Sequence, residues 1–186
     1  MTSPIPSTQT ATSGPAENAA LQEVAALQEV VDRLTGCYRQ IHATVMQGLP
    51  ICNPGLDVAA TGFRPWTVAG EAVWLGALVT PWFLGVMLLP AAGTDWRGIE
   101  PGTRRDCDLP AGSFTFLASE PDGFGMVFTC SLFSPMDRFP DQAMALEAAA
   151  SAVETILTPP APPPDPPPEP PKAEVSRRSL FTGRRG

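Results

Sequence analysis

The stretch from Glu71 to Asp95 carries no charged side chain between its two acidic ends, so the rest of the chain has to bury it. A helix over this stretch, rising about 1.5 Å per residue, could just cross a bilayer. Pro81 and Pro90 would interrupt such a helix, because proline removes a backbone hydrogen bond and clashes with the preceding turn. Apolar residues on both alternating faces instead predict two strands, 72–79 and 83–89, in the core of a globular domain.

The residues before this stretch predict an amphipathic helix over 20–47, with Gly36 as the position of any bend. Apolar side chains recur there at steps of three and four residues, which places them on one stripe facing the sheet. The stripe consists of Leu27, Val31, Leu34, Tyr38, Ile41 and Val45.

The residues that follow predict more strands and a second helix. Alternation of apolar and polar residues over 113–119 indicates a half-buried strand, and the turn at 120–123 should fold the next strand, 124–133, back antiparallel. Shorter extended segments are expected at 56–63 and 106–109, with a surface loop over 91–105. Pro140 suits the first turn of a helix, whose expected apolar stripe is Ala143, Leu146, Ala150, Val153 and Leu157. We therefore predict an α+β fold, a mainly antiparallel β-sheet with an N-terminal and a C-terminal helix packed on it.

The two ends of the chain cannot contribute to this core. Residues 1–18 are rich in Ser, Thr, Pro and Ala without apolar periodicity, and we expect them to be disordered. Residues 158–171 are dominated by proline, which predicts an extended polyproline II linker, and residues 172–186 form a basic tail. This leaves residues 19–157 as a single domain.

Charge is distributed unevenly between the domain and the tail. Up to Leu157 the net charge is −9, whereas the remainder has a net charge of +2. An acidic domain argues against nucleic acid as the main partner and favours a cationic one, which could be the tail itself. The N-terminus lacks the basic start and apolar run of a secretory signal, so we expect a cytoplasmic protein with reduced thiols.

No arrangement of residues predicts catalysis, a metal or a cofactor. His42 is the only histidine and lies at the edge of the helical stripe, where packing is the simpler role. Cys37 and His42 are too few to form a zinc site, since the chain has no Cys-x-x-Cys pair. Cys130 shares a strand face with Met126, Phe128 and Leu132 and is expected to be a small core residue.

Three stretches together resemble one known family. Residues 75–83 read LGALVTPWF and continue to Leu88-Leu89-Pro90; residues 109–112 read LPAG and are followed by CSLFSPM at 130–136; residues 176–183 read SRRSLFTG. These stretches are similar to signatures of the HybE/HupJ (HoxT) assembly chaperones of [NiFe] hydrogenases. The chain departs from the family pattern at Asp137-Arg138. The resemblance implies a non-enzymatic maturation factor, without catalytic residues, that binds a precursor hydrogenase subunit before export.

Four residues are candidates for the partner surface: Trp82, Phe83, Met136 and Phe139. Aromatic and Met side chains at strand ends often make adaptable apolar contacts, but packing in the core is the alternative for each of them.

The tail contains a twin-arginine pattern made by Ser176, Arg177, Arg178, Leu180 and Phe181. No apolar run follows it, so it cannot work as an export signal. Either it is a solvated basic tail, or it mimics the signal peptide of the hydrogenase small subunit and competes for an acidic groove on the domain.

Two other functional classes remain as alternatives. The chain could be a scaffold or adaptor whose proline-rich linker recruits partners that bind polyproline II segments. It could also be a thiol enzyme that uses Cys130, although no cationic neighbour is evident to activate that thiol.

Overall fold

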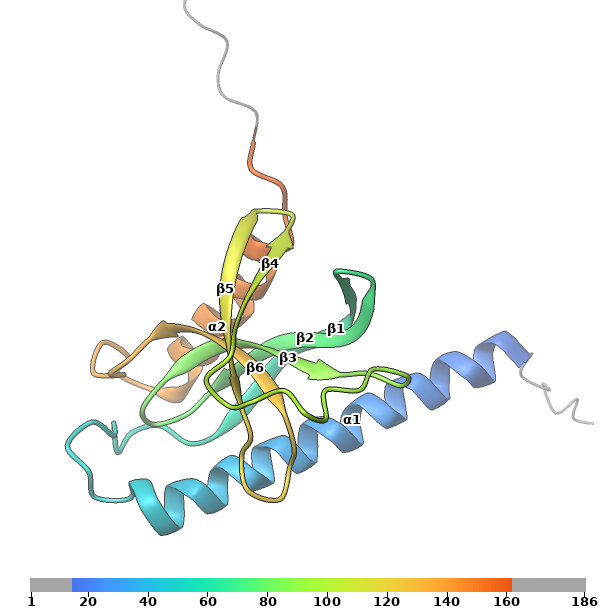
Figure 1. The fold of residues 1–186 in the computed structure, drawn as a ribbon. Helices are drawn as coiled ribbons and strands as arrows, with labels where there is room; N and C mark the ends of the chain where they lie inside the picture. The colour runs from blue at the N-terminus through green and yellow to red at the C-terminus, as the bar shows by residue number, and fades with distance from the viewer. Residues whose placement is uncertain (1–14, 162–186) are drawn as a thin grey trace, which may run out of the picture.

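The structure is a computed structural model that describes residues 15–161 (Figure 1). A long helix opens the fold, a six-stranded sheet follows, and a shorter helix closes it. The elements are α1 (Pro15–Ile41), the π-helical turn η1 (His42–Met46), β1 (Ala59–Val68), β2 (Glu71–Val79), β3 (Leu84–Pro90), β4 (Arg104–Leu109), β5 (Gly112–Ser119), β6 (Val127–Phe133) and α2 (Gln142–Ile156).

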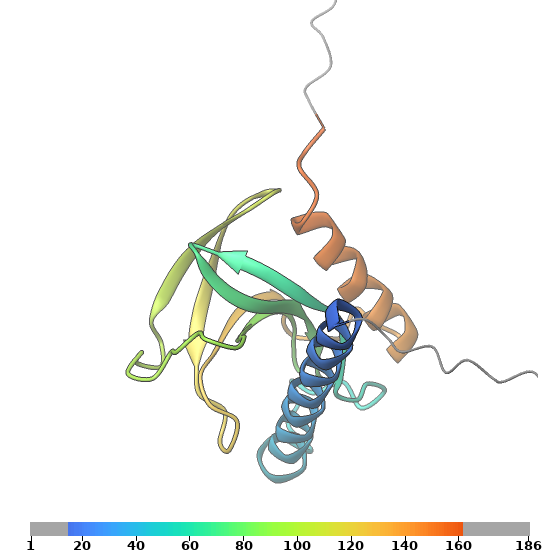
Figure 2. The same ribbon diagram turned by 90° about the vertical axis from the view of Figure 1, so that its right-hand side faces the viewer.

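The sheet has the strand order β1-β2-β3-β6-β5-β4, and all neighbouring strands are antiparallel. It is strongly curved, so that its two edge strands, β1 and β4, also come into contact. The helices α1 and α2 pack on different sides of this sheet (Figure 2). The predicted α+β fold with two helices on a mainly antiparallel sheet is therefore confirmed.

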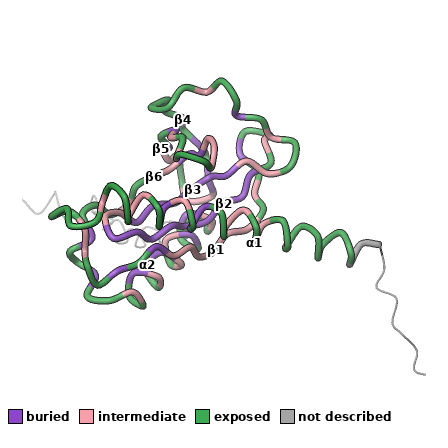
Figure 3. The backbone as a smooth tube through the Cα atoms, turned by 90° about the horizontal axis from the view of Figure 1, so that it is seen from below, coloured by how far each residue is buried: buried purple, intermediate pink, exposed green. Residues whose placement is uncertain are grey.

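The uncharged stretch forms β2 and β3, the two strands at the centre of the core. On β2, Val73, Leu75 and Ala77 belong to the apolar cluster that contains α2, whereas Trp74 and Leu78 belong to the cluster that contains α1. Figure 3 shows buried residues along most of these strands; β2 is buried from its third residue to its end, and β3 from its first residue almost to its end. The prediction of core strands covered on both faces is confirmed, and within residues 15–161 neither helix is long and apolar enough to cross a membrane.

The α1 side of β2 contains one position that accepts no side chain. A Cβ atom added at Gly76 would lie 2.3 Å from Cγ and 2.7 Å from the Cα of Phe63. Glycine at this position therefore allows the half-buried Phe63 ring of β1 to cross directly over the neighbouring strand, under α1.

The first helix differs from its prediction at both ends. It begins at Pro15, so residues 15–18 are helical although the sequence assigned them to a disordered end. Leu34 and Tyr38 are buried as expected, but Val45 is exposed. Val45 lies in η1, where the wider π-helical turn changes the rotation per residue and takes it off the stripe.

The second helix buries a different stripe from the expected one. Asp141 is its N-cap and accepts a hydrogen bond from the Met144 N–H, so Pro140 precedes the helix. The buried residues are Ala145, Ala149, Val153 and Ile156. Of the predicted stripe only Val153 is fully buried, because this alanine-rich sequence is apolar on several faces and its periodicity does not determine which face packs.

The first strand is also displaced along the chain. β1 spans Ala59–Val68 instead of the expected 56–63, and its pairing with β2 is interrupted by a bulge between Thr61 and Arg64. The strand expectations for 113–119 and 124–133 correspond to β5 and β6, which pair antiparallel as predicted.

Candidate functional site

Two of the sequence motifs meet at the end of the sheet where β2 and β3 are joined. The Thr80 N–H donates to the Phe83 carbonyl at 2.8 Å, which closes the reversal at residues 80–83. Leu84, just after it, pairs with Phe133 of β6, and the Ser134 hydroxyl donates to the Trp82 carbonyl at 3.0 Å. The TPWF and CSLFSPM segments, far apart in sequence, therefore form adjacent loops.

Asn53 ties these two loops to a third one, residues 47–58. Its backbone N–H donates to the Pro81 carbonyl at 2.8 Å. Its side-chain amide donates to the carbonyls of Met136 at 3.0 Å and Phe139 at 2.8 Å, and its Oδ1 accepts from the Gly55 N–H at 2.9 Å. The sequence indicated only the local Asn-Pro-Gly turn, because the three long-range bonds leave no mark on residue spacing.

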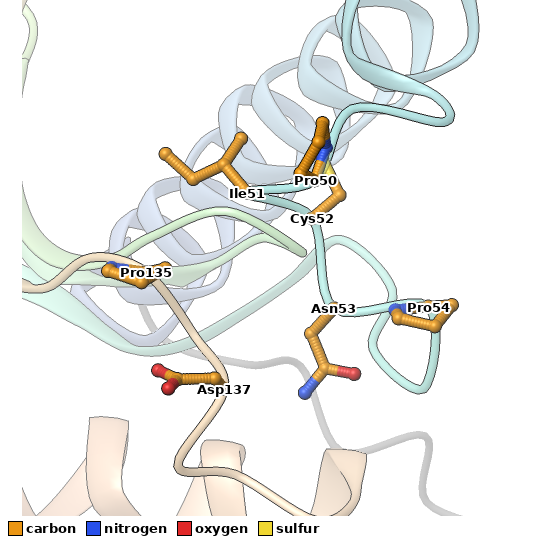
Figure 4. Close-up of a pocket in the computed structure, with 7 residues that line it drawn as sticks. All are labelled: Pro50, Ile51, Cys52, Asn53, Pro54, Pro135 and Asp137. Atoms are coloured by element: carbon orange, nitrogen blue, oxygen red, sulfur yellow. The ribbon is translucent and has the colours of Figure 1, made fainter.

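Two of these loops, 47–58 and the one that follows β6, line an open pocket of about 590 Å³. The 80–83 reversal is hydrogen-bonded to both of them but does not itself line the pocket. Figure 4 shows residues 50–54 on one wall and Pro135 and Asp137 on the facing wall. Large apolar side chains around it remain in contact with solvent: Leu49 is 43% exposed, Ile51 41% and Phe133 36%. The lining residues are Pro50, Ile51, Cys52, Asn53, Pro54, Pro135 and Asp137.

Two of the four candidate partner residues are half-buried on the α1 side of these loops. The Trp82 ring stacks on Tyr38, with ring centroids 6.4 Å apart, and lies 5.8 Å from the His42 ring. Phe83 meets Tyr38 edge to face at 5.9 Å. Burial raises the pKa of Tyr38 to about 12, so Tyr38 is a neutral packing residue at physiological pH. Trp82 and Phe83 thus form an anchored aromatic surface beside the pocket.

The other two candidates, Met136 and Phe139, are core residues that anchor the loop after β6. Met136 is fully buried and Phe139 is 8% exposed, and both belong to the core cluster on the α2 side. Phe139 also packs edge to face against Phe133 at 5.3 Å. For these two residues the structure shows the core packing that the sequence left as the alternative.

The loops around the pocket are acidic on their outer side. Asp57, Asp137 and Asp141 are exposed, and none of them forms an ion pair with another described residue. Asp57 and Asp141 accept hydrogen bonds from the N–H groups of Val58 and Met144, whereas Asp137 lines the pocket itself. The exposed Arg138 is the one cation in the 134–142 loop. An apolar pocket with an acidic edge suits a peptide that combines cationic and apolar side chains.

The thiols are not activated for chemistry. Desolvation raises the pKa of Cys52 in the pocket, whose Sγ donates to the Met46 carbonyl at 3.2 Å, and it also raises the pKa of Cys130. Both are therefore protonated near neutral pH, and a thiol is a poor nucleophile. Cys130 packs against the α2-side core together with Met126, Phe128 and Leu132, as predicted.

The residues considered for a metal do not come together. Cys37 donates to the Asp122 carbonyl at 3.3 Å, while His42 packs against Trp82. Among the described residues no group of three His, Cys, Asp or Glu side chains is arranged to hold a metal ion. The tail motif, Ser176 to Phe181, and most of the proline-rich linker lie outside the described residues.

Comparison with solved structures supports the fold. The chain is similar to the solution structure of HybE from Escherichia coli, with a TM-score of 0.57 and 25% sequence identity. The match covers 84% of this chain and 91% of that one. It therefore includes most of the sheet and its two helices.

Several curated relatives are similar over about 70% of the chain. A hydrogenase expression/formation protein, HupJ, from Bradyrhizobium diazoefficiens is 38% identical over 128 residues, which cover 69% of this chain and 72% of the relative. The hydrogenase expression/formation protein HoxT from Azotobacter vinelandii is 35% identical over 136 residues, covering 73% and 84%. The probable rubredoxin HupJ from Rhodobacter capsulatus is 34% identical over 134 residues, or 72% of this chain but only 47% of that protein.

A family model described as "[NiFe]-hydrogenase assembly, chaperone, HybE" matches residues 29–183. This match spans the sheet, the TPWF and CSLFSPM loops and α2. It confirms the resemblance inferred from the sequence motifs. The chain belongs to the HybE family of [NiFe]-hydrogenase assembly chaperones.

Proposed function

We propose that this chain is a non-enzymatic chaperone that binds a precursor subunit of a [NiFe] hydrogenase in the cytoplasm before the subunit is exported. Membership of the family supports the general role, and two relatives are named as hydrogenase expression/formation proteins. The observation that carries the proposal is that the CSLFSPM loop lines a pocket with exposed apolar residues around it and is hydrogen-bonded to the adjacent TPWF loop.

The subunit we propose is the small subunit, bound through its twin-arginine signal peptide. Such a signal combines two arginines with neighbouring apolar residues. The pocket offers complementary groups, because Asp137 can accept from a guanidinium while Ile51 and Pro135 provide apolar contact. The acidic charge of the domain would also accelerate the encounter with a cationic peptide.

Trp82 and Phe83 extend this surface beyond the pocket and suit the folded or partly folded body of the subunit. Both rings are already held by contacts with Tyr38, so little conformational freedom is lost when a partner covers them. Partly exposed aromatic residues that are pre-ordered in this way often dominate the energy of an interface.

Affinity purification of the tagged chain from cells that make the hydrogenase, followed by identification of the bound subunit, tests this proposal. We expect the small-subunit precursor to be recovered with the parent chain and at least about tenfold less of it with Ile51→Ser or Trp82→Ala, since one interface anchor contributes about 1.4 kcal/mol or more.

Leu117→Ser is the matched control, because Leu117 on β5 is 47% exposed and does not line the pocket. This variant should recover as much precursor as the parent. Equal recovery by Ile51→Ser, Trp82→Ala and Leu117→Ser would show that the pocket is not the binding site. Failure to recover any hydrogenase subunit with the parent chain would contradict the proposed function.

A further inference from the structure

We infer that in the free chaperone the tail segment 176–181 occupies the pocket between residues 50–54 and 135–137, so that a precursor signal has to displace it. The inference rests on the proposed function only in naming the precursor signal as the ligand that competes with the tail. Docking of the tail on the domain does not depend on that function and can be tested without a hydrogenase.

The position of the pocket relative to the end of the domain allows this contact. Asp137 lines the pocket and lies four residues before Asp141, the N-cap of α2, so the pocket borders the N-terminal end of that helix (Figure 4). The described chain ends beyond the other end of α2, at residue 161 (Figure 1). The 15 residues of α2 span about 22 Å.

The intervening chain is long enough to return to the pocket. Residues 162–176 separate the described domain from the arginine pair. Extended at about 3.1 Å per residue they would reach roughly 45 Å, about twice the length of α2. The tail can therefore run back along the helix without any rearrangement of the domain.

The chemistry of the segment matches that of the pocket. Arg177 and Arg178 can pair with Asp137, while Leu180 and Phe181 can contact the apolar side chains of Ile51 and Pro135 on the two facing walls. Guanidinium groups bind carboxylates with two parallel hydrogen bonds, which lysine cannot reproduce. The opposite net charges of the domain and the tail, −9 up to Leu157 and +2 beyond it, favour the contact at longer range.

Tethering makes even a weak contact effective. A tether whose reach matches the distance between two sites gives an effective concentration of up to about a millimolar. If the isolated tail peptide binds with a Kd of about 0.1 mM, the tethered tail would weaken the apparent affinity of a competing peptide about tenfold. The tail would thus suppress weak, non-specific ligands and still yield to a precursor that also contacts Trp82 and Phe83.

The first experiment measures tail docking alone. A fluorescently labelled peptide of residues 172–186 is titrated into the chain ending at Pro171. This truncated chain retains every residue of both core clusters, which lie between Leu27 and Leu157. We expect saturable binding, weakened at least about threefold by Asp137→Asn in the domain and to a similar extent when Arg177 and Arg178 of the peptide are replaced by lysine.

A matched control separates recognition of the motif from simple charge attraction. Replacing Arg184 and Arg185 by lysine changes the same number of guanidinium groups outside the motif and should leave binding unchanged. No binding up to about 1 mM would overturn the inference, because an effective millimolar concentration could not then hold the tail in place. Equal affinity of both lysine variants would overturn it too.

The second experiment uses the full chain and a labelled signal peptide of the hydrogenase small subunit. The variant with Arg177→Lys and Arg178→Lys should bind this peptide at least about twofold more tightly than the parent, as a threefold weaker tail contact requires, whereas Arg184→Lys with Arg185→Lys should not. If the tail peptide binds the truncated chain but the signal peptide binds no variant, the proposed function fails at its signal-binding step while tail docking stands. If the signal peptide binds equally to all full-length variants, the autoinhibitory inference fails while the proposed function stands.

Discussion

The two faces of the sheet are both apolar, but they are covered in different ways. On one face α2 lies close to the strands through Ala145 and Ala149, and the cluster around it extends from β2 to Cys107 on β4. On the other face α1 makes contact through a few larger side chains, chiefly Leu34 and Tyr38, while its N-terminal half extends past the sheet with exposed residues (Figure 3).

This difference separates the structural part of the molecule from the part available to a partner. The α2 side is a closed core whose residues are held on all sides. The α1 side passes gradually from buried residues to the half-exposed Trp82 and Phe83, which lie next to the pocket. Variants of core residues on the α2 side that lie away from the 134–139 loop should therefore affect folding alone, whereas variants at Trp82, Phe83 and the loops around the pocket should affect binding as well.

The adjacent residues Leu88 and Leu89 give the largest and most direct test of this comparison. Both are fully buried on β3, but Leu88 faces α2 and Leu89 faces α1. Truncation of a buried leucine to alanine costs about 2–5 kcal/mol, with the higher values where the surroundings cannot collapse into the cavity. We expect Leu88→Ala to lie toward the upper end of this range and Leu89→Ala toward the lower end, as measured by urea denaturation. Equal losses would remove the distinction between the two faces.

Gly76 provides the next largest effect, because it tests how closely β1 and β2 pack under α1. The added methyl group of Gly76→Ala would overlap Phe63, including its backbone, so we expect a loss of about 3 kcal/mol in the free energy of unfolding. Gly36→Ala is the control, since a Cβ atom at this exposed position in α1 meets nothing within 4 Å. It should stabilise the protein by up to about 1 kcal/mol, because alanine favours the helix. A Gly76→Ala variant as stable as the parent would contradict the close packing.

Substitution of Asn53 tests whether the loops of the site need their hydrogen bonds to one another to keep their arrangement. Asn53→Ala removes two amide hydrogen bonds to the carbonyls of Met136 and Phe139, and we expect a loss of about 2 kcal/mol in thermal or urea unfolding. Binding of the precursor should weaken in the same variant, because the pocket walls are no longer held together. Asn53→Asp, which has nearly the same shape but no amide donors, should lose at least as much stability. Full stability of the aspartate variant would show that these bonds do not hold the loops.

Substitution of Glu71 should produce the smallest effect. Glu71 is the first residue of β2, and its carboxylate accepts a hydrogen bond from Arg105 of β4, where the curved sheet closes. Hydrogen bonds from the Trp96 indole and then from Arg105 hold the pKa of Glu71 below its ordinary range. A lowered carboxylate pKa in the folded state means that the stabilisation is present above the pKa of the unfolded chain, about 4.3, and is lost as the pH falls through the folded value. Because Glu71 is partly exposed, Glu71→Gln should cost no more than about 1 kcal/mol at pH 7.

The pH dependence provides the control for this last variant. The difference in Tm between the parent and Glu71→Gln should shrink as the pH is lowered from 7 to 3, since the carboxylate of the parent becomes protonated. Asp95→Asn, which removes a solvent-exposed ion pair with Arg97, should leave the Tm at pH 7 unchanged. A difference between the parent and Glu71→Gln that stays constant with pH would exclude an electrostatic role for Glu71.

The sequence by itself determined the core strands and the class of fold. The uncharged stretch with Pro81 and Pro90 could not be a continuous helix, and its apolar residues on both faces required cover on both sides. Local alternation and turn residues likewise identified β5 and β6. These features depend on neighbours in the chain, which is why they can be read from residue order.

Only the tertiary structure decided which faces and loops meet. The alanine-rich α2 could have packed on several faces, and the contact with the curved sheet selected Ala145, Ala149, Val153 and Ile156. The same long-range contacts buried Met136 and Phe139, left Trp82 and Phe83 half-exposed, and turned Asn53 from a local turn residue into the link between three loops. The candidate site was therefore only half predictable, because exposure and cross-loop hydrogen bonds depend on residues that are distant in sequence.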